Sequence, residues 1–271
     1  MPFDDPPFIL ALLFVVAISY RLLRGLSGLF FLTSKEKIAL SAFYSKNLPY
    51  FNKLDPKLQY RFMFRANSLR RSFKVVGRQG FQVTDEVRLM VVAALVQITF
   101  GFSHYRLPRF RTIFVYPDSY RNPYTGRVHD GEVHPRGLII LSWKRLVKGF
   151  EDPADKINLG LHEMAHALMH TILHTHEHEQ GLDEYLERVI NLSKDEIEKI
   201  NSGGSHFFRP YAGASVDEFF AVAIEHFFEA PVEFLAQLPK LYKKLTQLLK
   251  QDPARNIFVI KSDWDIYRRI A

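Results

Sequence analysis

Apolar and polar positions along the chain mostly follow helical periods, and two short stretches follow a strand pattern. Residues Leu89 to Phe100 are apolar on nearly every side of a helix, which predicts a buried central helix opened by Thr84, Asp85 and Glu86. Two apolar runs of strand length lie at 112–116 and 137–143. The pattern therefore predicts an α+β fold that is mostly helical and has a small sheet.

Capping signals divide the first part of the chain into further helices. Ser34 is expected to cap a helix over residues 35–43, and Asp55-Pro56 is the start of another, with Asp as the cap and Pro in the first turn. Residues 77–80 form a turn between this region and the central buried helix. Residues 118–136 are rich in turn residues, and no strand is predicted there.

A second helical region follows the strand at 137–143. Asp152-Pro153 is expected to begin a helix that ends before Gly181 and carries one apolar stripe, formed by Ile157, Leu161, Met164, Leu168 and Ile172. Further helices are predicted over 183–200 with a capping box at Ser193, over 217–229 after Ser215, and over 232–250 with a break at Pro239.

The strand at 137–143 has two interpretations. It can form the edge of the sheet and pair with an extended substrate, which gives affinity through main-chain hydrogen bonds. It can equally be an ordinary core strand.

The N-terminal residues 7–26 form an apolar run interrupted only near its end by Arg21 and Arg24. We expect a single membrane anchor over this run, with residues 1–33 as an anchor region and 34–271 as the main domain. Because the basic residues follow the run, the main domain is expected to face the cytoplasm. The alternatives are a soluble core helix in place of the anchor and a soluble cytoplasmic protein.

Composition narrows the chemistry. The chain has 271 residues, a formal charge of +7, a pI of about 9.4 and no cysteine, so thiolate metal ligands and disulfides are excluded. A basic surface can attract nucleic acid. We find no zinc finger, RNA-recognition motif or dense arginine tract, and we expect no nucleic-acid partner.

The stretch His162-Glu-Met-Ala-His166 carries the clearest chemistry. Histidines four positions apart lie above one another on a helix, so both imidazoles can bind one metal ion. The arrangement is the H-E-x-x-H pattern of zinc peptidases, in which Glu163 is the general base. The motif predicts a zinc-dependent peptidase.

A catalytic zinc ion takes three protein ligands, and the third must come from further along the chain. Local sequence leaves open whether Glu218, Glu225, His206 or the histidines at 170–178 provide it. A rigid helix argues against the histidines at 170–178. Glu218 has an alternative role, since Ser215-Val-Asp-Glu218 fits a capping box in which Glu218 turns back to the Ser215 amide.

Three stretches together resemble the Mlc titration factor A family of zinc peptidases, and more distantly the catalytic domain of anthrax lethal factor. They are 158–166, 211–222 and 225–231, and the resemblance covers about residues 45–255. It implies that His162, His166 and Glu218 bind Zn²⁺, that Glu163 is the base and that Tyr211 lies beside the reacting carbonyl. It also implies a peptide or protein substrate.

The resemblance carries one departure and one alternative function. The family has an acidic residue three positions after the second histidine, where this chain has Met169, so a hydrogen bond to a ligand histidine is expected to be lost. A named family member binds a transcriptional repressor, so a protein that sequesters such a partner is the alternative to a peptidase.

Overall fold

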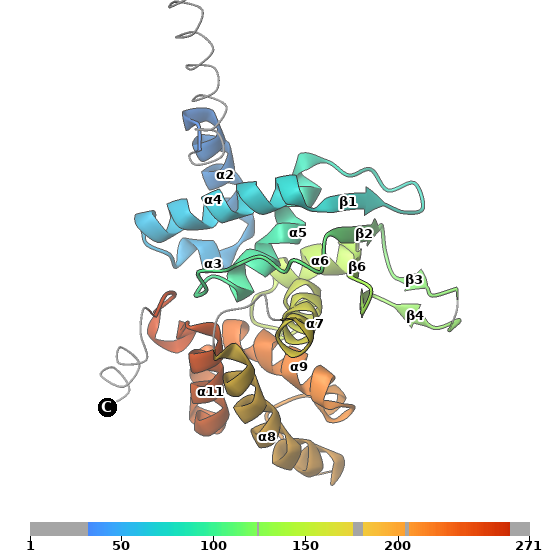
Figure 1. Ribbon diagram of the computed structural model, residues 1–271, viewed down its shortest axis with the longest axis vertical. Helices are drawn as coiled ribbons and strands as arrows, with labels where there is room; N and C mark the ends of the chain where they lie inside the picture. Colours follow the sequence, from blue (N-terminus) through green and yellow to red (C-terminus); the bar gives the residue numbers. More distant parts are fainter. Residues whose placement is uncertain (1–31, 124, 176–180, 204–205, 261–271) are drawn as a thin grey trace, which may run out of the picture. The chain divides into compact units, whose positions relative to one another are not determined.

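The computed structural model describes residues 32–123, 125–175, 181–203 and 206–260 (Figure 1). The chain divides into two compact units, residues 1–43 and 44–271. No helix within the described residues is long and apolar enough to cross a membrane. The predicted anchor at 7–26 lies outside the described residues and stays a prediction.

Helix α2 spans Ser34–Asn47, and a capping box formed by Thr33 and Glu36 opens it. The hydroxyl of Thr33 accepts a hydrogen bond from the Glu36 amide at 3.2 Å, and the Glu36 carboxylate accepts one from the Thr33 amide at 3.0 Å. The cap is therefore Thr33, where Ser34 was predicted.

Caps at Asp55 and Thr84 are confirmed. The Asp55 carboxylate accepts a hydrogen bond from the Leu58 amide at 2.8 Å, and the Thr84 hydroxyl accepts one from the Val87 amide at 3.3 Å. These caps open α4 and α5, and α5 is buried almost throughout, as predicted. The elements of this region are α3 (Pro49–Asn52), α4 (Pro56–Ser72), β1 (Lys74–Gly77), α5 (Asp85–Ile98) and β2 (Thr112–Tyr116).

The main sheet has the strand order β1-β2-β6-β5, in which β1, β2 and β6 are parallel and β5 is antiparallel to β6. Strand β6 (Leu138–Ser142) therefore lies inside the sheet, so the interpretation of this stretch as a sheet edge was wrong. The two edges are β1 and β5 (Gly131–His134), and β5 lies in the region where only turns were predicted. That region also holds the small ribbon of β3 (Tyr120–Arg121) and β4 (Val128–His129).

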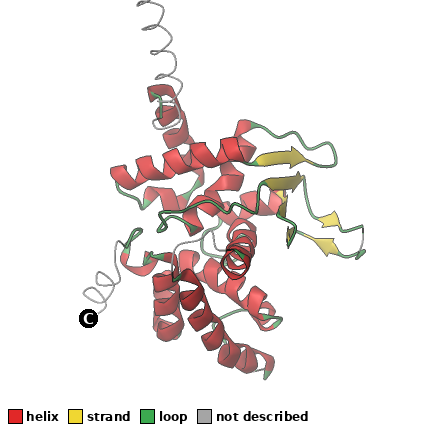
Figure 2. Cartoon of the chain, in the orientation of Figure 1, coloured by secondary structure: helices red, strands yellow, loops and turns green. Residues whose placement is uncertain are grey.

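The helices after the sheet make up most of the remainder (Figure 2). They are α6 (Trp143–Glu151), α7 (Leu159–His174), α8 (Leu182–Asn201), α9 (Val216–Glu229), α10 (Pro231–Gln237) and α11 (Pro239–Leu249), with single 3₁₀ turns η1 (Pro210–Gly213) and η2 (Pro253–Arg255). Helix α7 packs against α5 and α9 and beside β5, so the apolar interior lies around α7.

Two details of these helices differ from the sequence prediction. Helix α7 starts at Leu159 and is capped by the Asn158 carboxamide, so the predicted start at Asp152-Pro153 was wrong and Ile157 is 57% exposed. Ser193 lies inside α8 and its hydroxyl donates to the Ile190 carbonyl, so the predicted capping box there does not exist. The predicted break at Pro239 is confirmed, because α10 ends and α11 begins there.

Candidate metal centre

His162 and His166 lie one turn apart on α7 and present their rings to the same side. Their ring centroids are 4.8 Å apart, and their Nε2 atoms are 3.2 Å apart. The helix begins at Leu159 because Asn158 accepts a hydrogen bond from the Leu161 amide at 3.0 Å. The first histidine therefore lies in the first turn of a capped helix, where the backbone is held firmly.

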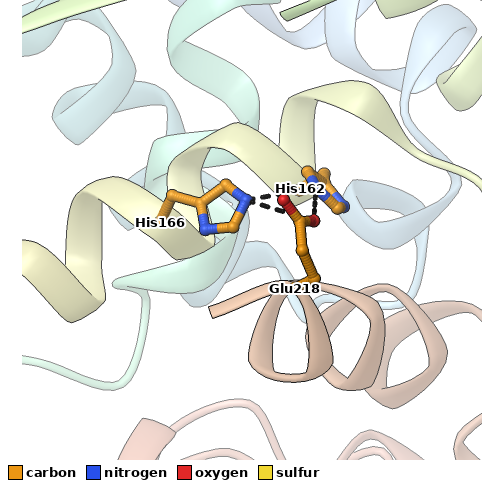
Figure 3. A group of neighbouring side chains, drawn as sticks. All are labelled: His162, His166 and Glu218. Atoms are coloured by element: carbon orange, nitrogen blue, oxygen red, sulfur yellow. Dashed lines mark hydrogen bonds and ion pairs between the residues drawn. The ribbon is translucent and has the colours of Figure 1, made fainter. Parts of the chain in front are cut away.

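Glu218 reaches the two histidines from the first turn of α9 (Figure 3). Its Oε2 atom is 3.0 Å from the Nε2 of His162 and 3.6 Å from that of His166. Ser215 caps α9 by accepting a hydrogen bond from the Glu218 amide, yet the Glu218 carboxylate points to the histidines. Of the two roles that the sequence left open for Glu218, the structure favours that of a metal ligand.

The donor set of His162, His166 and Glu218 fits a metal ion. One ligand atom from each residue lies within 4.8 Å of the others. Ligand atoms about 2.1 Å from a tetrahedral zinc ion would be separated by roughly 3.4 Å. The three separations found here are 3.2, 3.0 and 3.6 Å, so the side chains are already grouped at that spacing.

Glu225 lies on the opposite side of the His162 ring and is 1% exposed. Its Oε1 atom is 2.6 Å from the Nδ1 of His162. A carboxylate accepts, so His162 donates to Glu225 from Nδ1, and a metal ion in the centre would bind the Nε2 atom. Glu225 is thus an orienting partner for His162, whereas sequence left it open as a third ligand.

Glu225 is itself held by two donors. Arg209 donates to both carboxylate oxygens, at 2.8 and 3.1 Å, and the backbone amide of Asn158 donates at 3.0 Å. Burial raises the pKa of Glu225, but the hydrogen bonds from His162 and Arg209 outweigh it and lower the pKa overall. Sequence reasoning did not find this arrangement, because 63 residues separate the two partners His162 and Glu225.

The carboxylates also set the charge of His162. Burial lowers the pKa of His162, but hydrogen bonds to Glu218 and Glu225 outweigh it and raise the pKa to about 10. Burial raises the pKa of Glu218, and hydrogen bonds with both histidines reverse this and hold the pKa well below its usual range. In the absence of a metal ion, His162 is therefore positively charged at neutral pH and paired with two ionised carboxylates.

Glu163 lies next to the histidines but is not one of the three donors. It is 5% exposed, and its Oε2 atom has no hydrogen-bond partner among the described residues. Burial raises its pKa to about 7. A carboxyl group with a pKa near neutral is suited to accepting and releasing a proton.

Gly131 on the edge strand β5 leaves the space in which the Glu163 side chain lies. A β-carbon on Gly131 would come within 2.7 Å of Cγ and Cδ of Glu163. The strand can therefore pass directly beside the carboxylate only because this residue has no side chain.

Tyr211 lies at the same centre, in η1, with its ring centroid 6.1 Å from that of His162. The residue is 52% exposed, and its hydroxyl forms a hydrogen bond with Glu218. Partial burial, together with the negative charge of Glu218, raises its pKa to about 12. The hydroxyl therefore keeps its proton at neutral pH and remains a hydrogen-bond donor.

Two adjoining cavities, of about 400 and 480 Å³, meet at these residues, and we call them together the metal cleft. Both are lined by His129, Gly131, His162, Glu163 and Tyr211. The Nε2 atom of His129 is buried without a hydrogen-bond partner among the described residues. Neither Gly131 nor His129 was found from sequence, because their strands are too short and polar to be predicted.

The remaining candidate ligands lie elsewhere. His206 faces away from the donors, 2.8 Å from Glu196 on α8. His170 and His174 form a pair with ring centroids 4.5 Å apart at the far end of the metal cleft. His176 and His178 lie outside the described residues. Met169, where the family has an acidic residue, is 4% exposed and lines the cleft. The carboxylate that contacts a ligand histidine in this chain is Glu225, which lies against His162.

Comparison with known proteins assigns the chain to a family. Residues 32–250 match the model of the glucose-regulated metallo-peptidase M90 family. Mlc titration factor A of Salmonella agona (strain SL483) is 25% identical over 239 residues, which cover 80% of this chain and 88% of that protein. Mlc titration factor A of Salmonella typhimurium (strain LT2) matches to the same extent. With two histidines and a glutamate grouped as a metal-binding set, the chain belongs to the M90 metallopeptidases, the family of Mlc titration factor A.

Proposed function

We propose that this protein is a zinc peptidase in which His162, His166 and Glu218 hold the ion. The observation that carries the proposal is the grouping of these three donors at ligand spacing, with the buried Glu163 carboxylate beside them. Two imidazoles and one carboxylate are a donor set that zinc prefers, and the pattern of three protein ligands leaves a position for water.

In the proposed reaction, Glu163, Tyr211 and Glu225 each have a separate role. Zinc, when bound, makes water a better nucleophile and polarises the scissile carbonyl. Glu163 accepts the proton of the attacking water and later passes it to the leaving amine. The Tyr211 hydroxyl donates a hydrogen bond to the oxygen on which negative charge develops, a contact of a type worth roughly 3–4 kcal/mol. Glu225 keeps the His162 ring in place.

The edge strand β5 gives the proposed substrate a place to lie. Among the described strands, β5 is the last of the sheet and pairs only with β6. Its residues Gly131, Glu132 and Val133 line the metal cleft beside Glu163. An extended peptide that adds to this edge would cross the proton-accepting carboxylate, which supports a peptide substrate bound through its main chain.

The test uses purified full-length protein, metal analysis and a peptide library. We expect one zinc ion per chain and cleavage by the wild type. Glu163→Gln should keep the zinc and lose cleavage, whereas Glu218→Ala should lose the zinc. Glu187→Gln, the same change at an exposed position on α8, serves as the control and should behave as the wild type. Full zinc content in Glu218→Ala, or full cleavage by Glu163→Gln, would refute the assignment.

The second candidate is capture of a partner protein. It is favoured by the name of the relatives, Mlc titration factor A, which describes the titration of a protein called Mlc. A transcriptional repressor or other partner would then be sequestered, with peptidase activity secondary. Glu163→Gln distinguishes the two, because capture survives the loss of the base and catalysis does not.

A further inference from the structure

Ile157 is an apolar residue that lies exposed in the wall of the metal cleft. The sequence pattern predicted it on the buried side of a helix, but it precedes α7 and is 57% exposed. Large apolar or aromatic side chains are exposed at six positions among the described residues, namely Ile38, Val128, Ile157, Leu173, Tyr211 and Val232. Four of these six line the metal cleft, and only Ile38 and Val232 do not. Exposed apolar surface is therefore concentrated at the cleft, as expected of a binding groove.

Three hydrogen bonds hold the backbone around Ile157. They run from Arg209 to the Lys156 carbonyl at 2.7 Å, from the Ile157 amide to the Asp155 carboxylate at 2.9 Å, and from the Asn158 amide to Glu225 at 3.0 Å. Arg209 and Glu225 also belong to the group that holds the His162 ring. The backbone that carries Ile157 is therefore fixed by the same side chains that orient the metal centre.

The residue before Ile157 has an unusual backbone conformation. Lys156 has a φ of 63°, in the left-handed region that residues with a β-carbon rarely occupy. Its side chain is held as well, since Nζ lies 2.7 Å from Glu233 Oε2 and 5.4 Å from the ring centre of Phe207. Strained residues of this kind persist only where their surroundings enforce them, and they are common at functional sites. The strain beside Ile157 therefore indicates that the position of this residue serves a function.

The charged side chains of this part of the cleft are mostly paired with one another. Arg209 is 2.8 Å from Glu225, and Arg145 is 3.5 Å from Asp130. Lys148 lines the same cavity and has no ion-pair partner among the described residues, so an acidic substrate group is the alternative occupant. Lys148 is exposed, however, and a single exposed charge contributes little binding energy in water. The wall therefore favours an apolar group over a charged one.

We propose that Ile157 and Val128 form an apolar subsite of the metal cleft, which binds an apolar side chain of the peptide substrate. Both residues line the cavity of about 400 Å³ that also contains Gly131 and Glu163. The subsite is thus continuous with the edge of β5, where the peptide is proposed to lie. The inference rests on the proposed function and narrows the substrate class to peptides with a large apolar residue near the scissile bond.

Cleavage of a matched peptide series by the full-length protein with zinc tests the subsite. The peptides carry leucine, serine or glutamate at one position at a time, on either side of the scissile bond. At one of these positions we expect kcat/KM for leucine to exceed that for serine by about tenfold or more, with glutamate no better than serine. Equal values for leucine and serine at every position, or a preference for glutamate, would overturn the proposal.

Variants assign the preference to this wall. Ile157→Ser and Val128→Ser should each lower the ratio of leucine to serine to about threefold or less, with zinc content and circular dichroism to verify folding. Ile157→Val keeps a branched apolar side chain and should retain most of the ratio. Val232→Ser changes an exposed apolar residue outside the cleft and should leave the ratio as in the wild type. A wild-type ratio in both Ile157→Ser and Val128→Ser would refute the assignment.

A binding measurement separates this inference from the proposed function. Fluorescence polarisation with labelled peptides and the Glu163→Gln protein requires no cleavage, and the leucine peptide should bind about tenfold more tightly than the serine peptide. If the wild type cleaves no peptide, the proposed function fails, and the ratio of affinities still tests the subsite. Equal affinities would overturn the subsite and leave any observed cleavage unexplained by it.

Discussion

The Glu163 carboxylate fills the space that a side chain on Gly131 would need. Gly131→Ala should therefore displace the proposed base while the zinc ligands stay in place. A displacement of about 1 Å near reacting groups can cost on the order of 10²-fold in rate. We expect a loss of that size in peptide cleavage with unchanged zinc content.

The matched background for this prediction is Glu163→Gln. The baseline is the residual cleavage that Glu163→Gln retains. If Gly131 acts only through Glu163, then Gly131→Ala should not lower this residual rate further. An additional loss in that background would show that Gly131 acts in some other way, for example by contacting the substrate.

Glu225→Gln removes the negative charge behind His162 while keeping the shape of the side chain. Partners of this kind typically contribute 10–100-fold to metal affinity or activity, so we expect zinc binding to weaken by a factor in that range. Competition with a chelating dye measures it. Zinc affinity equal to that of the wild type would show that the 2.6 Å contact does not orient the ring.

Glu229 should make the protein less stable at alkaline pH. Its folded pKa of about 8 lies above the value of 4.5 expected when unfolded, so the folded state binds more protons between these values. Stability is thus highest below pH 4.5 as far as this group is concerned, and falls as pH rises toward 8. Urea unfolding at pH 5 and 9 measures this effect. Between these two pH values the free energy of unfolding of the wild type should fall by a few kcal/mol more than that of Glu229→Gln.

His226 should have the opposite dependence. It is 2% exposed, packs against the rings of Phe207 and Phe208, and its pKa is lowered to about 4 by burial. The unfolded state therefore binds more protons between pH 4 and 6.5, and stability is lost as pH falls through that range. The loss is on the order of 3 kcal/mol. His226→Phe should flatten the acid limb of the stability profile, and an unchanged limb would assign it to other groups.

Metal binding should stabilise the whole domain, because the proposed ligands come from two helices, α7 and α9. A ligand that binds only the folded state at 100 times its dissociation constant adds about 2.7 kcal/mol. Zinc should therefore raise the melting temperature and a chelator should lower it. Glu218→Ala should show neither shift, and an equal shift in this variant would locate the zinc elsewhere.

The sequence predicted those elements that depend on residues close to one another in the chain. The caps at Asp55, Thr84 and Ser215 depend on residues three positions apart, and the H-E-x-x-H spacing depends on one helix turn. It failed for β5, whose four residues are half-buried and follow no clear alternation. It also failed for the start of α7, because Asp152-Pro153 is as good a start signal as Asn158 when tertiary contacts are ignored.

The residues of the candidate site also fall into those that a local pattern predicts and those that it does not. His162 and His166 were assigned from spacing alone, while Glu218 depended on the family resemblance and is now placed beside them by the structure. The roles of Glu225, Arg209 and Gly131 come from contacts between distant parts of the chain. No local pattern marks such contacts, so the sequence could not predict them.

Asn158 uses every polar group of its side chain, and its backbone amide too, for a different neighbour. It caps α7 through Oδ1, reaches Gly149 and Glu229 through Nδ2, and supports Glu225 through its amide. No substitution at this position can therefore separate folding from chemistry. A variant library would score Asn158 as intolerant without saying why, and only its neighbours Glu225 and Glu229 can report the individual contributions.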